Sequence, residues 1–226
     1  PNAEELLKEY GAENNPAFQN LLGNIYASEQ AGTPDYAQAK AMFERSANAG
    51  DPEGQASLGL MYYRGSGVPQ DYRQARFWLE KAAAQDQADA QTLLGSLYDN
   101  GWGVKQDFAQ ARAWYEKAAA QGEPEAQFMA GLMYSDGTGT AQDYKKAAYW
   151  YEKAAKKGHP EAQNNLAARY ATGTGVPRDM AKAKYWYRKA AAQGNQSAAY
   201  TLQQLEALEK SEQKGKGSLK TATRKP

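Results

Sequence analysis

The sequence has 226 residues, with 27 Lys or Arg against 26 Asp or Glu, and no cysteine. A formal net charge of +1 argues against nucleic acid as the main partner, because a nucleic-acid-binding chain is expected to carry a strongly basic face. The lack of cysteine excludes disulfides, thiolate catalysis and zinc sites with cysteine ligands. No apolar run approaches the roughly 20 residues that span a bilayer.

Residues 89–124 return without gaps when the sequence is shifted by 36 positions in either direction. This stretch reads DAQTLLGSLYDNGWGVKQDFAQARAWYEKAAAQGEP, and the copy before it reads EGQASLGLMYYRGSGVPQDYRQARFWLEKAAAQDQA. A fixed period of this length indicates one structural unit stacked on itself. We therefore predict a single solenoid of five units, residues 17–52, 53–88, 89–124, 125–160 and 161–196.

Residues 1–16 precede the first unit and contain a short helix predicted over residues 3–10. It falls where the end of a preceding unit would lie, so we interpret it as a cap over the open edge of the first unit. Asn15 and Pro16 then restart the chain as a helix N-cap and a first helical residue.

Each unit is predicted to contain two helices, and the first carries a small residue at a fixed place. These residues are Gly23, Gly59, Gly95, Gly131 and Ala167. Because glycine inside a helix costs roughly 0.5 to 1 kcal/mol relative to alanine, its recurrence predicts that a neighbouring helix comes too close for a side chain. A tyrosine follows three residues later on the same face in every unit.

A loop with two glycines joins the helices of units two to five and predicts left-handed backbone at the helix end. A G-x-G spacing also occurs in phosphate-binding loops, but here it recurs four times and no strand precedes it, so the structural interpretation is favoured. An aspartate opens the second helix of every unit: Asp35, Asp71, Asp107, Asp143 and Asp179. These predict N-caps, with a capping box where Gln follows three residues later in the first three units; their spacing is that of repeats rather than of a catalytic pair.

The second helix carries an apolar stripe, in the second unit Ala75, Trp78, Leu79 and Ala82. This i, i+3, i+4, i+7 spacing predicts a buried face with one bulky aromatic layer per unit, Trp included. After the fifth unit, residues 197–210 resemble one more first helix and are predicted to cap the C-terminal end. Residues 211–226 lack apolar residues to bury and are predicted to form a disordered basic tail.

The repeated pattern is A-x-x-x-L-G-x-x-Y-x-x-G-x-G-V-x-x-D-Y-x-x-A-x-x-W-Y-x-K-A-A-x-x-G. It resembles the Sel-1-like repeat, a relative of the tetratricopeptide repeat with a longer loop between its helices. The first copy departs most, with Met42 in place of Trp and no G-x-G. The resemblance implies an all-α, right-handed superhelical solenoid of antiparallel helix pairs whose concave side binds proteins or peptides. It also implies adaptor work in bacterial secreted, periplasmic and host-contact proteins, some of which are immunity proteins that neutralise toxic effectors such as phospholipases.

Catalytic and metal chemistry have little support in this sequence. His159 is the only histidine, and a metal site needs several converging ligands. Without cysteine or a second histidine, a Ser-His or Cys-His nucleophile pair is unsupported. The sequence therefore predicts a protein that is not an enzyme and that uses no cofactor and no metal.

The residues that the repeat does not dictate are the candidates for partner binding. On the first helix, the positions aligned with Ala56, Leu60 and Tyr63 vary from unit to unit, and their spacing places them on one helical face. The resemblance places first helices on the concave side, so this face is expected to meet a partner. The candidate set is Asn24, Leu60, Tyr63, Ser96, Asp99, Trp102, Phe128, Leu132, Ser135 and Asn164.

Two alternatives concern these candidates. Leu60, Tyr63, Phe128 and Leu132 are predicted apolar anchors, but Phe128 and Leu132 are equally consistent with filling gaps between helices. Trp102 stands between two loop glycines where other units have Ser or Thr, which suits either a binding anchor or local packing. The basic tail is interpreted as a solvated terminus, with attraction to acidic surfaces or anionic lipid as the alternative.

The leading functional hypothesis is a non-catalytic scaffold that binds a protein or peptide in its concave groove. A periplasmic or secreted bacterial protein is favoured over a cytoplasmic one, and an immunity protein that neutralises a secreted antibacterial effector is one concrete form. The alternatives are an envelope-assembly or signalling adaptor that joins partners by its two faces, and a host-interaction factor. An enzyme on a repeat fold has the least support.

Overall fold

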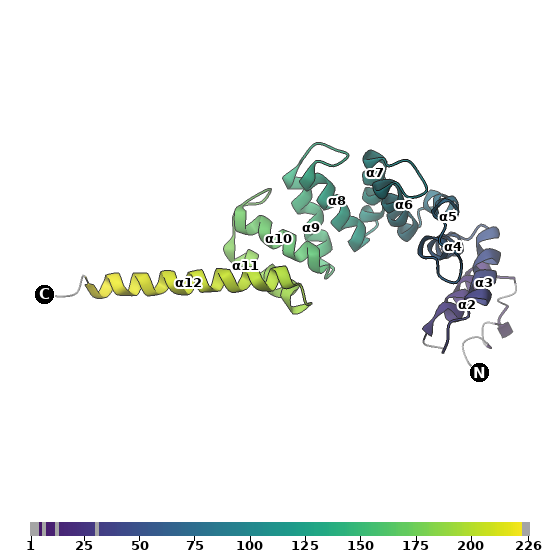
Figure 1. Ribbon diagram of the computed structural model, residues 1–226, viewed down its shortest axis with the longest axis horizontal. Helices are drawn as coiled ribbons and strands as arrows, with labels where there is room; N and C mark the ends of the chain where they lie inside the picture. The colour runs from purple at the N-terminus through teal and green to yellow at the C-terminus, as the bar shows by residue number, and fades with distance from the viewer. Residues whose placement is uncertain (1–4, 6–7, 12–13, 30–31, 223–226) are drawn as a thin grey trace.

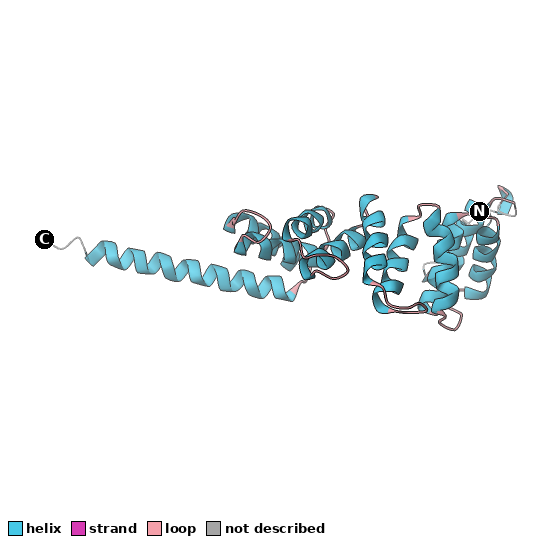
Figure 2. Ribbon diagram, turned by 90° about the horizontal axis from the view of Figure 1, so that it is seen from above, coloured by secondary structure: helices cyan, strands magenta, loops and turns pink. Residues whose placement is uncertain are grey.

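The computed structural model describes residues 5, 8–11, 14–29 and 32–222, and all regular structure within these ranges is helical (Figure 2). Half of the predicted helix over residues 3–10 lies outside the described residues; of the described half, residues 5, 8 and 9 are helical. The helices are α2 (Pro16–Ala27), α3 (Tyr36–Asn48), α4 (Pro52–Arg64), α5 (Tyr72–Ala84), α6 (Ala88–Asn100), α7 (Phe108–Ala120), α8 (Pro124–Asp136), α9 (Tyr144–Lys156), α10 (Pro160–Thr172), α11 (Met180–Ala192) and α12 (Gln196–Ala222).

Consecutive helices pack as antiparallel pairs, and the pairs follow one another in a curved row (Figure 1). Each predicted unit is one pair: α2 with α3, α4 with α5, α6 with α7, α8 with α9, and α10 with α11. Among the first helices of the units, α2 contacts α4, and α4 contacts α6. In the first three units, the first helices therefore line the inner side of the curve. The predicted all-α solenoid is confirmed.

The helix ends form where the sequence places them. The predicted aspartate N-cap is confirmed in all five second helices; in α9, for example, the Asp143 carboxylate accepts a hydrogen bond of 3.0 Å from the backbone N–H of Lys146. The first glycine of each two-glycine loop has positive φ, such as 69° at Gly65, so the predicted left-handed helix end is also confirmed.

The predicted capping box is only half formed. In a complete box, the glutamine side chain accepts a hydrogen bond from the backbone N–H of the capping residue. Here the N–H of Asp71 donates to the carbonyl of Tyr62 at 3.0 Å, and that of Asp107 donates to Tyr98 at 2.9 Å. The predicted reciprocal bond is wrong because the donor it needs already ties the end of the loop to the first helix.

The small residue on the first helix marks a close helix crossing, as predicted. A Cβ atom added at Gly59 would lie 2.8 Å from the Leu79 side chain, and one at Gly131 would lie 2.6 Å from the Tyr151 ring. The second loop glycine has a similar role between units, since a Cβ at Gly103 would lie 2.7 Å from the backbone of Tyr72. Glycine thus allows the close contact between the two helices of a pair and the close contact between a loop and the previous pair.

The predicted burial of tryptophan requires a correction. Trp78, Trp114 and Trp150 are only half-buried, and the layer inside each pair is filled by the following residue, such as Leu79 or Tyr115. Trp150 packs against the buried clusters of two neighbouring units. The tryptophans therefore cover the seam between units, where part of the ring stays in solvent.

A buried glutamine in each of units two to five, which sequence reasoning missed, links each unit to its neighbour. The Nε2 groups of Gln55, Gln91, Gln127 and Gln163 donate to the carbonyls of Ala47, Ala83, Ala119 and Ala155 on the preceding second helix. In three units, the Oε1 atom accepts from a second glutamine at the end of the same pair: Gln85 to Gln55, Gln121 to Gln91 and Gln193 to Gln163, at 2.8 to 2.9 Å.

The fourth unit breaks this pattern. Lys157 stands where the other three units have glutamine, and its ammonium keeps only the bond to a glycine carbonyl, that of Gly122, which Gln85 and Gln193 also make at Gly50 and Gly158. Among the described residues, the buried Oε1 of Gln127 consequently has no hydrogen-bond partner. An unsatisfied buried acceptor carries a desolvation penalty, so we expect this junction to be less stable than its counterparts.

The C-terminal helix α12 packs its first turns against α11 through Leu202 and Leu205 and then extends away from the solenoid (Figure 1). Gln203 lies 36 residues after Ala167, at the position that is Gly or Ala in each unit. Its larger side chain occupies the place where a further second helix would pack. The boundary predicted at residue 210 is wrong, because the helix continues to Ala222. The exposed Lys, Glu and Gln side chains just beyond that boundary favour helix even without packing.

None of the described helices combines the length and apolarity needed to cross a membrane.

The corrected core predicts unequal losses of stability for two adjacent aromatic residues. Tyr115 is 2% exposed, so Tyr115→Ala should cost about 3 to 5 kcal/mol of unfolding free energy. Trp114→Ala should cost about half as much, because the half-buried ring leaves a smaller cavity. Urea unfolding followed by circular dichroism measures both values, and equal losses would contradict the correction.

The broken glutamine pair predicts a stabilising substitution. Lys157→Gln should supply the missing donor to Gln127 and raise the unfolding free energy by about 1 kcal/mol. The matched reverse change, Gln193→Lys, removes the donor to Gln163 and should lower it by a similar amount. Thermal unfolding of the two variants tests the pairing, which is incorrect if both shift the midpoint in the same direction.

Candidate protein-binding surface

Nine of the ten candidate residues lie on the first helices of the units and Trp102 lies in the loop after α6, and their exposure is unequal. Asn24 and Trp102 are exposed, and Ser135 is buried, with 7% of its surface exposed. The other seven are half-buried: Leu60, Tyr63, Ser96, Asp99, Phe128, Leu132 and Asn164. The expectation that this face points outward is therefore wrong for Ser135, whose hydroxyl accepts a hydrogen bond from Arg169 of the next unit.

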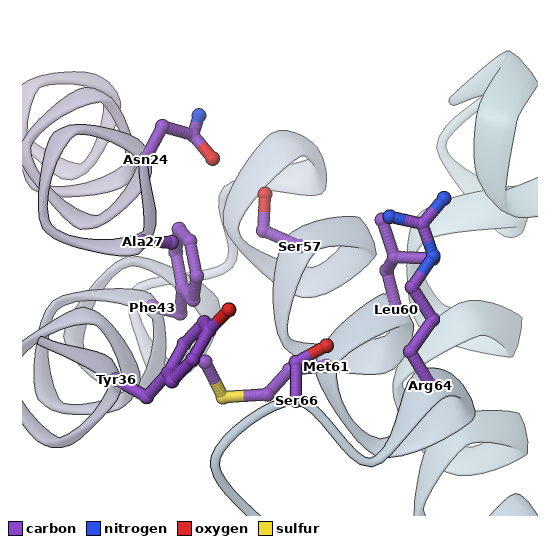
Figure 3. Close-up of a pocket in the computed structure, with 9 residues that line it drawn as sticks. All are labelled: Asn24, Ala27, Tyr36, Phe43, Ser57, Leu60, Met61, Arg64 and Ser66. Atoms are coloured by element: carbon purple, nitrogen blue, oxygen red, sulfur yellow. The ribbon is translucent and has the colours of Figure 1, made fainter. Parts of the chain in front are cut away.

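A pocket of about 230 Å³ opens between α2 and α4 (Figure 3). Asn24 lines one side of it and Leu60 the other, so the structure brings two candidate residues together. Phe43 and Met61, which belong to the buried core, form part of its wall. The site offers an apolar surface between two polar groups, the Asn24 amide and the Arg64 guanidinium.

Sequence reasoning missed Arg64 as a pocket residue, although the sequence contained a signal. The positions aligned with Arg64 are Asn100, Asp136 and Thr172, which vary as freely as the chosen stripe. Arg64 follows Leu60 by four residues, so the two lie on one face of α4. The variable face is thus one helical turn longer than predicted.

An aromatic cluster follows at the next junction. The Trp102 ring stacks on Tyr72 with a centroid distance of 5.0 Å and meets Tyr63 edge-on at 6.1 Å. The Tyr63 hydroxyl is hydrogen-bonded to Ser96 at 2.9 Å. Local packing therefore accounts for the position of Trp102, while 38% of its surface remains exposed for contact with another molecule.

Asp99 contributes a charged group to the same junction. Partial burial raises the pKa of its carboxyl above the ordinary value. Burial and the nearby Asp99 carboxylate also raise the pKa of Tyr115. Within the described ranges, no Lys or Arg lies at ion-pairing distance from Asp99. The junction therefore leaves a carboxylate whose charge is not balanced by a direct partner.

The candidates farther along the chain are engaged in packing. The Phe128 ring stacks on His159 with centroids 4.6 Å apart, and with Leu132 it covers a buried cluster. The gap-filling interpretation is thus supported for both residues. The Asn164 side-chain oxygen is buried and has no hydrogen-bond partner among the described residues.

His159 has a structural role at this junction. Its Nδ1 accepts a hydrogen bond from the backbone N–H of Ala162 at 3.2 Å and so caps α10. Its Nε2 lies 2.9 Å from the Glu125 carboxylate, and the interaction lowers the pKa of Glu125. Within the described part of the chain, no group of three or more His, Asp or Glu side chains could hold a metal ion.

Repeated helix pairs with a variable inner face define the class of α-solenoid repeat proteins. A family model described as the Sel1 repeat matches residues 16–51, 52–87, 88–123, 124–159 and 160–195. The protein therefore belongs to the Sel1 repeat family, which confirms the resemblance. The matched boundaries fall one residue before those drawn from the period.

Solved structures of bacterial Sel1 repeat proteins are similar to this chain. A protective antigen of uropathogenic Escherichia coli is 38% identical with a TM-score of 0.82, over 89% of this chain and 43% of that one. A Sel1 repeat protein of Oxalobacter formigenes is 36% identical with a TM-score of 0.82, over 89% of this chain and 58% of that one. The chain thus spans about half the length of these two relatives.

An immunity protein of Pseudomonas aeruginosa is 20% identical with a TM-score of 0.54, over 86% of this chain and 75% of that one; this likeness shows the fold alone. The search of curated proteins found no match.

The aromatic cluster predicts a modest structural role for Trp102. Trp102→Ser, which introduces the residue of the second unit, should lower the unfolding free energy by about 1 kcal/mol through loss of stacking. Urea unfolding measures this loss, with Thr138→Ser at the equivalent loop position of the fourth unit as the control. A loss above about 3 kcal/mol would mean that Trp102 belongs to the core.

Proposed function

We propose that this protein is a non-catalytic scaffold that binds a partner protein through the groove lined by α2, α4 and α6. The observation that carries the proposal is a succession of three features along these units: the pocket at Leu60 and, at the next junction, the exposed edge of Trp102 and the unbalanced carboxylate of Asp99. Aromatic side chains such as Trp and Tyr are enriched among the few residues that dominate binding energy.

The charges of this groove indicate the chemistry of the partner. The three helices of the groove together carry Glu53, Asp89 and Asp99 against one cation, Arg64. A partner segment with Lys or Arg for Asp99 and an apolar side chain for the pocket would complement the surface. Neutralisation of a toxic effector is a narrower form of the proposal, supported by the immunity proteins that share this fold at about 20% identity.

Photo-crosslinking tests where the partner binds. A photoreactive amino acid at position 24, on the groove side, should capture a discrete partner from an extract of the source bacterium, and one at position 102 should capture the same partner. The exposed Ala113 on the outer side of α7 is the matched control position and should not capture it. Capture at position 113 with none at 24 or 102 would contradict the proposal.

Substitutions then test the residues with the captured partner. Leu60→Asp and Trp102→Ser should each weaken binding roughly 10-fold to 100-fold, as expected for anchors, whereas Phe77→Ser on the outer face should leave it unchanged. If Asp99 binds a cation, affinity should fall as the pH is lowered through its raised pKa, because the carboxyl then becomes neutral. Asp99→Asn should remove this pH dependence. Unchanged affinity in folded Leu60→Asp and Trp102→Ser proteins would overturn the assignment.

A further inference from the structure

The charges of the chain are strongly separated along its length. Residues 1–136 contain ten Lys or Arg against nineteen Asp or Glu, whereas residues 137–226 contain seventeen against seven. Much of the C-terminal excess is on two second helices, because α9 has four lysines and one glutamate, and α11 has four basic residues and no acidic one. The net charge of the whole molecule is therefore near zero even though the outer side of the last two units is basic.

The two helices present the same stripe of side chains to solvent. On α9 it consists of Lys146, Tyr149 and Lys153, and on α11 of Lys182, Tyr185 and Lys189. The i, i+3, i+7 spacing places each set on one helical face. The aligned residues are Gln74, Phe77 and Lys81 on α5, and Gln110, Ala113 and Lys117 on α7. The full Lys-Tyr-Lys stripe therefore occurs on adjacent units four and five and not on units two and three.

Aromatic rings, rather than carboxylates, hold these lysines. Lys153 lies 5.1 Å from the centre of the Tyr149 ring, and Lys189 lies 5.3 Å from that of Tyr185. Lys146 and Lys182 lie similarly over tyrosines of the first helices. Among the described residues, none of the four has a carboxylate at ion-pairing distance. A cation–π contact orients a lysine without neutralising it, so the stripe keeps its charge.

The tyrosines at the centre of the stripes are exposed but held in place. Tyr149 is 52% exposed and Tyr185 is 49% exposed. Each ring meets the neighbouring tryptophan edge-on, with centroids 5.0 Å apart. Half-exposed, pre-oriented tyrosines lose little conformational freedom when they bind, and they are enriched at protein interfaces.

We propose that this outer surface of α9 and α11 is a second protein-binding site, which takes an acidic segment of a partner polypeptide. An extended polyanion such as DNA or an anionic membrane would also meet the acidic N-terminal units, which would repel it. A short acidic segment that lies across units four and five is attracted by the stripe lysines and does not reach the acidic N-terminal units. The tyrosines lie against their tryptophans and supply flat apolar contact between the charges. The site is separate from the groove of the first three units and does not depend on the function proposed for it.

The test uses the full chain and a fluorescein-labelled peptide of twelve glutamates and two alanines, with fluorescence anisotropy at low salt. Reversal of all four stripe lysines (Lys146→Glu, Lys153→Glu, Lys182→Glu, Lys189→Glu) should weaken binding by at least about 10-fold. The matched control reverses four exposed cations of the first three units (Arg45→Glu, Arg73→Glu, Lys81→Glu, Lys105→Glu) and should retain affinity within about 3-fold.

A second variant separates the contribution of the tyrosine rings to binding from that of the lysine charges. Tyr149→Ser with Tyr185→Ser leaves the net charge unchanged and should weaken peptide binding by about 3-fold to 10-fold. Circular dichroism establishes that each variant is folded, and Lys→Gln changes at the four positions replace the reversals if those unfold. Retained binding by the Trp102→Ser protein shows that the site is independent of the groove.

Three results would overturn the proposal. The first is equal loss of peptide binding in the stripe and control reversals. The second is stripe-dependent binding to vesicles with 30% phosphatidylserine, or to single-stranded DNA, that is tighter than peptide binding at the same ionic strength. The third is sedimentation evidence that the stripe instead binds the acidic units of a second copy of this chain.

Discussion

The architecture depends on one steric constraint, which is the closeness of the two helices within each pair. At Gly95, an added Cβ would lie 2.8 Å from the Tyr115 ring, so the ring rests directly on the backbone of the first helix. Only a very small residue permits this distance. Because the same crossing is repeated in each unit, every first helix keeps one face covered by its partner, and α2, α4 and α6 present the opposite face to the inside of the curve. The groove is a consequence of this crossing.

A second constraint holds between units and is polar. A glutamine buried against a backbone carbonyl of the preceding helix fixes the register of two stacked pairs, because amide hydrogen bonds are directional while apolar contacts are not. Burying an amide is favourable only when it is hydrogen-bonded, and three of the junctions meet this condition through a second glutamine. At the fourth junction Lys157 replaces the second glutamine, and the Oε1 atom of Gln127 has no hydrogen-bond partner among the described residues. Stacking strength therefore differs along a solenoid whose backbone is almost periodic.

The sequence was sufficient to predict the features that local chemistry determines. The aspartate caps, the loop glycines and the small residues follow from backbone sterics and hydrogen bonding within a few residues, and the structure confirms them. Features set by a neighbouring unit could not be predicted. Trp114 and Tyr115 are adjacent in one apolar stripe; Tyr115 is buried on Gly95 of its own pair, whereas the cover over Trp114 depends on the neighbouring units. Ser135 is covered by Arg169 from the following unit, a contact that no pattern within one unit contains.

The same separation between local and neighbouring effects would let one solenoid carry the two binding surfaces proposed above. Each unit transmits packing forces mainly to its neighbours, so a segment bound across α9 and α11 leaves the crossing that shapes the pocket between α2 and α4 unstrained. Electrostatic forces reach farther, yet they are screened within about 8 Å at physiological salt. The two proposed surfaces, the groove of the first units and the basic stripes of the last, would therefore select partners of opposite charge independently, because neither has to change shape or lose its field when the other is occupied.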